Sequence, residues 1–226
     1  MTLDRGAGAS GARAVLPVLL GVAPFGMIFG VLARGSGIPP VAAQAMSMIV
    51  FAGSAQFIAV QLIGAGAPAA VVFLTTAVVN IRHALYSATL APYLRPLAAR
   101  WRWTLPYLMV DEVFAVTIVR ARQSSPEQTG RYMLGAGITL WTTWQISTAI
   151  GIFLGAQVPA SWSLEFALPL TFVALLLPSL RDRAGVVAAL TAGIVAILTL
   201  RLPLKLGIVV SAIAGIVAGL VADQRQ

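Results

Sequence analysis

The stretch VVFLTTAVVNIRHALYSATLAPY (71–93) decides the fold class of this chain. It is mostly apolar and long enough to cross the hydrocarbon core of a bilayer, which takes about 20 residues. It nevertheless contains Asn80, Arg82 and His83, and His83 is the only histidine in the chain. An arginine inside such a run lies either at the edge of a membrane or within it for a functional reason.

The composition of the whole chain agrees with that stretch. Of 226 residues, 59% are hydrophobic and 10% are charged, whereas a soluble domain carries about 25% charged residues. Lipid offers no hydrogen bonds to the backbone, so long apolar segments must be helical. We therefore predict an all-α fold: a polytopic inner-membrane helical bundle of seven or eight transmembrane segments with interrupted helices. The predicted segments are 14–33, 41–63, 68–92, 104–119, 132–155, 164–180, 184–200 and 207–222.

The predicted domain organisation is simple. The Gly/Ala-rich start, 1–13, is expected to be a disordered tail, 14–222 a single transmembrane domain, and 223–226 a short C-terminal tail. The net charge of +8 comes from basic residues that lie mostly between the apolar runs. Basic loops contact lipid headgroups and set orientation, so we expect a lipid bilayer and no nucleic acid as the partner of these charges.

The basic loops leave the orientation of one segment open. Arginines lie in 95–102 and again in 120–131, on the two sides of 104–119. Both loops are expected on the cytoplasmic side, which is impossible if 104–119 crosses the membrane once. Either this segment re-enters the membrane, or the arginines at 95–102 lie outside.

Proline and glycine predict interruptions in several helices. Pro24 lies within the first segment, Gly53 within the second and Pro169 within the sixth, and proline removes an intrahelical hydrogen bond. Broken helices in transporters expose backbone groups near the middle of the membrane, where substrates bind. Three glycine pairs have instead the spacing of close helix packing. These pairs are Gly26 with Gly30, Gly151 with Gly155, and Gly215 with Gly219.

In the second segment Gln44, Ser47, Ser54 and Gln61 are predicted to share one helix face. The motif FAGSAQF (51–57) also contains Gly53 and Gln56, which lie away from that face, so polar groups lie on two sides of one helix. A break at Ala52, Gly53 and Ser54 would free amide N–H groups for an anion. The alternative is ordinary hydrogen bonding between helices by serine and by glutamines such as Gln56.

Helical spacing places the polar residues of the third segment on one face. Thr76, Asn80, His83 and Ser87 recur at four, three and four residues, and Arg82 begins an adjoining row. We expect this face to line a cavity or to contact other helices. Arg82 has two further interpretations: a position near the headgroups, or a structural ion pair with a carboxylate.

The fourth segment contains the adjacent carboxylates Asp111 and Glu112. Consecutive helical residues point about 100° apart, so the two cannot serve one face. One of them could pair with Arg82 or bind an ammonium group.

Several classes of chemistry are excluded. The chain has no cysteine, so thiolate catalysis and zinc–sulfur sites are excluded. A single histidine and scattered acids do not form a metal site, and no catalytic triad order, P-loop or dinucleotide motif is present. We predict no cofactor, no metal and no enzymatic activity.

Six motifs resemble one family. They are PFGMIFG (24–30), SMIVFAGSAQF (47–57), VVNIRHALYS (78–87), VDEVFA (110–115), YMLG (132–135) and FALPLTFVALLLP (166–178). In this order they resemble the AzlC/YgaZ family, the large subunits of branched-chain amino acid exporters. The resemblance implies a multi-pass protein of the bacterial inner membrane with a small AzlD/YgaH-type membrane subunit as its partner. It also implies export of valine, leucine, isoleucine and sometimes methionine.

The expected substrate is a zwitterion with an aliphatic side chain. Its site must therefore contain groups that bind the carboxylate, groups that bind the ammonium, and an apolar wall for the side chain. Arg82 and the break that includes Gly53 and Ser54 are the candidates for the carboxylate. The candidate acceptors for the ammonium group are Asn80, Gln56, Asp111 and Glu112. Candidates for an apolar wall are Phe51, Phe57 and Trp144.

His83 is the candidate for proton coupling, because an unperturbed histidine titrates near neutrality. A hydrogen-bonded packing role is its alternative. Two other functions stay open at this point. One is a passive channel or structural membrane subunit, and the other is a membrane enzyme built on His83 and Asp111.

Overall fold

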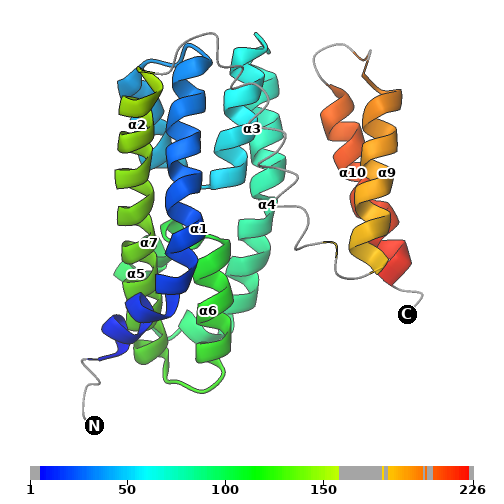
Figure 1. The fold of residues 1–226 in the computed structure, drawn as a ribbon. Helices are drawn as coiled ribbons and strands as arrows, with labels where there is room; N and C mark the ends of the chain where they lie inside the picture. Colours follow the sequence, from blue (N-terminus) through cyan, green and yellow to red (C-terminus); the bar gives the residue numbers. More distant parts are fainter. Residues whose placement is uncertain (1–5, 158–179, 181–182, 201, 203–205, 224–226) are drawn as a thin grey trace. The chain divides into compact units, whose positions relative to one another are not determined.

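The computed structural model describes residues 6–157, 180, 183–200, 202 and 206–223, and this part of the chain is all-helical (Figure 1). The contacts divide the chain into two compact units, each described by itself. One unit comprises Met1–Phe57 and Ala77–Val158, and the other comprises Ile58–Thr76 and Pro159–Gln226. The helices are α1 (Ala7–Gly35), α2 (Pro40–Val50), α3 (Gly53–Gly64), α4 (Ala69–Leu94), α5 (Ala99–Tyr107), α6 (Asp111–Ala121), α7 (Pro126–Gly155), α9 (Arg183–Leu198) and α10 (Leu206–Asp223).

The first unit is organised around two long parallel helices, α1 and α7 (Figure 1). Their backbones approach closely because glycines lie in the interface. A Cβ added at Gly11 would collide with the carbonyl of Tyr132, and one added at Gly151 would collide with the carbonyl of Met27. Gly30 faces the backbone of Thr148 in the same way. The packing role predicted for the glycine pairs of these two helices is therefore confirmed.

This packing also explains the extent of α1. The helix begins at Ala7, whereas the sequence predicted a disordered tail as far as residue 13. Ala7 is 1% exposed, and Gly11 packs on α7, so contacts with α7 order this start. The interruption predicted at Pro24 is wrong, because α1 continues through Pro17 and Pro24. Long helices between other helices tolerate one lost hydrogen bond.

The break predicted in the second segment is confirmed. Helix α2 ends at Val50 and α3 begins at Gly53. Phe51 between them has φ 41° and ψ 47°, the left-handed conformation that is rare for a residue with a side chain. The chain reverses there, and the first turn of α3, as far as Phe57, leads back toward the end at which α1 finishes (Figure 1).

A second break, which the sequence analysis did not predict, lies between α5 and α6. Helix α5 ends at Tyr107 and α6 begins at Asp111. Before this hairpin, Leu97 lies against Gly130 of α7. After it, the guanidinium of Arg120 lies 6.0 Å from the ring centre of Tyr132, also on α7. Both ends of the α5–α6 hairpin therefore lie beside the start of α7, which is the arrangement that re-entry of 104–119 requires.

The element order of the first unit repeats itself. A long helix followed by two short ones occurs twice, first as α1, α2 and α3 and then as α4, α5 and α6. The first set begins at 7, 40 and 53 and the second at 69, 99 and 111, so the offsets are 62, 59 and 58 residues. The hairpin of the first set enters from the end where α1 finishes, and that of the second from the end where α7 starts (Figure 1). The two sets thus have opposite direction.

In the second unit, α9 and α10 pack against each other. Gly215 lies on Ala188 and Ala192, and Gly219 lies on Ala188 and Ala184, so the predicted packing role of this third pair is also confirmed. The predicted segment 164–180 and its Pro169 fall almost wholly outside the described residues. The predicted count of seven or eight segments therefore stays a prediction.

Candidate functional site

Arg82 joins the α2–α3 hairpin to the α5–α6 hairpin. Its Nη1 donates to Oδ2 of Asp111 at 2.6 Å, and its Nη2 donates to Oγ of Ser54 at 2.6 Å. Ser54 lies in the first turn of α3 and Asp111 opens α6, so one guanidinium from α4 contacts the beginnings of two broken helices. The side chains of Arg82 and Asp111 remain 29% and 42% exposed. The described part of the chain therefore does not enclose the pair.

The starts of α3 and α6 carry different charges. The first amides of any helix lack intrahelical acceptors and give its N-terminus a partial positive charge. Helix α6 has Asp111 and Glu112 in its first turn, which complement that charge. Helix α3 has no acidic residue in its first turn. The α3 start beside Arg82 is therefore the more favourable place for an anion.

The ends of α2 and α5 also meet. The hydroxyl of Tyr107, the last residue of α5, donates to the carbonyl of Met48 on α2. Trp141 of α7 donates its Nε1–H to the same hydroxyl at 2.7 Å. The ring of Phe51 lies 6.1 Å from that of Tyr107. Tyr107 thus joins the ends of α2 and α5, and Arg82 joins the starts of α3 and α6. The tips of the α2–α3 and α5–α6 hairpins are therefore connected at two places.

Several buried polar atoms of α3, α4 and α6 have no hydrogen-bond partner within the described part of the chain. They are Nε of Arg82, Oδ1 of Asp111, Oδ1 of Asn80 and Nε2 of Gln56. Gln56 is fully buried, and its Oε1 accepts from the amide of Ala52 at 3.2 Å. Buried polar groups normally have partners. These atoms are two donors, Nε of Arg82 and Nε2 of Gln56, and two acceptors, Oδ1 of Asp111 and Oδ1 of Asn80.

An aromatic cluster packs beside the α3 start. Phe25 stacks on Phe57 with 4.2 Å between ring centres, and Phe29 stacks on Trp144 at 6.1 Å. Gly53 faces this cluster, since a Cβ there would lie 3.3 Å from Trp144. Of the predicted apolar wall, Phe57 and Trp144 belong to the cluster, whereas Phe51 packs on Tyr107 instead.

The sequence analysis missed Phe25 and Phe29, although their i, i+4 spacing in PFGMIFG places them on one face of α1.

The remaining predicted residues lie nearby with other contacts. Nδ1 of His83 is 3.2 Å from the carbonyl of Asn80, and its ring lies edge-on to Tyr86 at 5.9 Å. Of the two adjacent carboxylates, Asp111 alone pairs with Arg82 within the described residues, as their 100° separation requires. Glu112 is half-buried beside it.

One stripe was predicted wrongly. Gln44 and Ser47 do not share a face with Ser54, because the chain reverses at Phe51. Instead they bond α7: Gln44 donates to Oε1 of Gln145 at 2.8 Å, and Ser47 lies 2.9 Å from Oγ1 of Thr148. Gln145 and Thr148 therefore lie on a packing face of α7.

The described residues offer no cluster of three or more residues that could hold a metal ion.

Comparisons with known proteins support one family. The family model described as AzlC protein matches residues 17–158, more than half of the chain. The inner membrane protein YgaZ of Escherichia coli K12 is 27% identical over 81% of this chain and 78% of its own length. An uncharacterized membrane protein of Archaeoglobus fulgidus is 31% identical over 79% of this chain and 78% of its own length. The branched-chain amino acid transport protein AzlC of Bacillus subtilis 168 is 25% identical over 78% of this chain and 69% of its own length.

No solved structure gives a significant match.

These relatives are named as membrane or transport proteins, and none of the three is named as an enzyme. The chain is thus a member of a family of membrane proteins. It belongs to the AzlC protein family, as its six motifs predicted.

Proposed function

We propose that this chain is a secondary transporter that exports branched-chain or similar small neutral amino acids across the bacterial inner membrane. The observation that carries the proposal is the position of Arg82 between the starts of two broken helices. Helix starts near the middle of a membrane bind the carboxylates of transported substrates in other folds. The name of the Bacillus subtilis relative points to the same cargo.

The membrane location has independent support. Helices α1 and α4 are long and apolar enough to cross a bilayer. Large apolar side chains on the outside of the first unit include Leu20 at 82%, Ile49 at 76% and Phe153 at 68% exposure. An apolar outer surface of this kind suits lipid rather than water. We therefore propose a multi-pass bundle, with 14–222 as one transmembrane domain.

The proposed site divides the substrate among three sets of residues. The carboxylate is held by Arg82 and by the amides of Gly53 and Ser54. The ammonium group is held by Asp111 and Asn80, each of which has one oxygen without a hydrogen-bond partner within the described residues.

The other polar residues of the site have proposed secondary roles. Gln56 supplies a further polar contact, and Glu112 adds negative charge. The aromatic cluster of Phe57 and Trp144 contacts the aliphatic side chain.

The opposite direction of the two hairpins suits alternating access. Transporters built from inverted repeats open to one side of the membrane and then the other as one repeat moves against its counterpart. Here the hairpin tips meet at the substrate site. A movement of either hairpin would open the site toward the end from which that hairpin enters.

Transport by the reconstituted protein tests the proposal. Proteoliposomes loaded with valine should exchange it for external labelled leucine, and unlabelled valine should compete whereas glutamate should not. Arg82→Gln should reduce exchange at least tenfold, because it removes the charge that faces the carboxylate. Flux without discrimination among these solutes would indicate a passive channel. Absence of exchange in every lipid and partner condition would indicate a structural subunit.

A small AzlD/YgaH-type subunit is the proposed partner. The charge of Arg82 gives no ground for such a partner, because Asp111 of the same chain pairs with it. The proposed partner rests on the family resemblance alone. Export should require co-expression of both chains, and full valine export by this chain alone would contradict it.

A further inference from the structure

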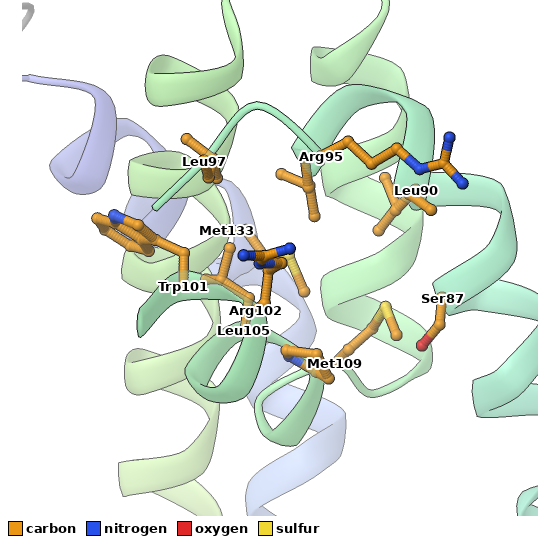
Figure 2. A pocket seen from close by; sticks show the side chains of 12 residues that line it. Ser87, Leu90, Arg95, Leu97, Trp101, Arg102, Leu105, Met109 and Met133 are labelled. Carbon is orange, nitrogen blue, oxygen red and sulfur yellow. The ribbon is translucent and has the colours of Figure 1, made fainter. Parts of the chain in front are cut away.

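A cavity of about 160 Å³ lies between the C-terminal part of α4 and helix α5, with Met133 of α7 in its wall (Figure 2). Its lining contains none of the residues proposed for the substrate site. Four of its lining side chains are apolar and almost fully buried: Leu90, Leu105 and Met133 are 1% exposed, and Met109 is 3% exposed. The volume is close to that of an apolar cavity of about 150 Å³ that accepts a molecule of the size of benzene. This cavity therefore suits a short, branched alkyl group.

Two arginines border this apolar cavity. Arg102 of α5 lies beside Leu105 and Met133, and Arg95 lies on the side of Leu90 (Figure 2). Both are exposed, and neither guanidinium forms an ion pair within the described residues. The cavity also lacks any carboxylate among its lining residues. A ligand with an anionic end is favoured there, and an ammonium group has no acidic partner.

We propose that this cavity binds a short branched aliphatic carboxylate, with the alkyl group between Leu90 and Met133 and the carboxylate on Arg102. The 2-oxo acids that transamination produces from branched-chain amino acids have this chemistry. They keep the carboxylate and the branched tail but lack the ammonium group. The cavity thus distinguishes an oxo acid from the amino acid, whereas the Arg82 site is built for the zwitterion.

Calorimetric binding to the purified full-length protein in lipid nanodiscs tests the proposal without any transport assay. The probes are 4-methyl-2-oxopentanoate, leucine and the uncharged 4-methylpentanamide. The oxo acid should bind and be displaced by 4-methylpentanoate but not by the amide. Its binding should persist in Arg82→Gln, which makes a failure here distinguishable from a failure of the proposed transport function.

Matched variants locate the site. Arg102→Gln should weaken oxo-acid binding about tenfold, whereas Arg100→Gln, on the same helix but outside the cavity, should leave it unchanged. Ala91→Phe should abolish binding by filling the cavity, and Ala88→Phe, at an exposed position on α4, should not. Equal effects within either pair would overturn the proposal. So would leucine binding that depends on Arg102 and is as tight as that of the oxo acid.

Discussion

At the scale of single residues, Arg82 and Phe51 show how a few side chains define the centre of the first unit. Phe51 occupies a left-handed conformation that costs about 1–2 kcal/mol for an L-residue. It is 3% exposed and packs beside Tyr107, so burial offsets that cost. Such strain is common where function needs an interrupted helix. Arg82 contacts the helix that begins just after this break.

The contact between Arg82 and Asp111 predicts a measurable coupling. Arg82→Gln and Asp111→Asn should each lower the midpoint of thermal unfolding, because each leaves one charge without its partner. The double variant should cost less than the two single changes together, by about 0.5–1 kcal/mol for a partly exposed pair. Thermal unfolding in nanodiscs measures this. The pair Arg120→Gln and Asp111→Asn serves as the control and should be additive. Additivity in the first pair would mean that the contact contributes nothing to stability.

His83 carries a separate prediction. Its neighbours with titratable or charged groups are Arg82, Tyr86 and Asp111. If its protonation couples to transport, His83→Gln should flatten the pH dependence of valine efflux between about pH 5 and 8, the range in which histidine titrates. Tyr86→Phe, which keeps the ring beside His83, should retain the pH dependence. An unchanged profile in His83→Gln would leave this histidine with a packing role.

At the scale of elements, helix packing in the first unit depends on where glycine faces a neighbouring backbone. Gly30 of α1 faces Thr148 and Ile152 of α7, whereas Gly21 of the same helix has open space around it. The spacing of glycines predicted the first contact. The spacing could not predict which other glycines lack a contact with a neighbouring helix, because that depends on where two helices cross.

These two glycines make a matched experiment. Gly30→Ala should lower the unfolding midpoint, because its methyl group requires α1 and α7 to separate, at a cost of about 1–3 kcal/mol. Gly21→Ala should leave the midpoint unchanged or raise it slightly, because alanine is the better helix former and meets no neighbour. The measurement is again thermal unfolding in nanodiscs. A similar loss in both variants would contradict the packing described for α1 and α7.

Sequence patterns predicted one of the two breaks and missed the other, for a physical reason. The first is marked by polar residues on two sides of 51–57 and by a glycine. The second, at 108–110, lies in the apolar sequence LMV and has no glycine. It is stabilised instead by contacts that only the tertiary structure provides, such as Gly137 of α7 against Leu108. The stripe that joined Gln44 to Ser54 failed for the same reason, since periodicity assumes an unbroken helix.

At the scale of the molecule, we propose that the α5–α6 hairpin re-enters the membrane, which resolves the conflict between the two basic loops. Arg95, Arg100 and Arg102 precede the α5–α6 hairpin, and Arg120 and Arg122 follow it. Because both ends of the hairpin lie beside the start of α7, all five arginines lie at one end of the first unit. The positive-inside rule assigns that end to the cytoplasm.

The absence of cysteine from the sequence makes this orientation directly testable. Single variants Ala98→Cys and Gln123→Cys should both be protected from a membrane-impermeant thiol reagent added to intact cells, and both should react after permeabilisation. Ser36→Cys, just after α1, should react in intact cells. Opposite accessibility of positions 98 and 123 would mean that the segment between them crosses the membrane and does not re-enter.

The double contact of Arg82 has a consequence for the transport cycle. The guanidinium of Arg82 contacts Ser54 of one hairpin and Asp111 of the other. The same guanidinium is the proposed binding group for the substrate carboxylate. A solute that takes Arg82 must displace at least one of these partners, which leaves the two hairpins free to separate. An empty site would then hold them together, so that a cargo is required for each change of direction and idle leakage is suppressed.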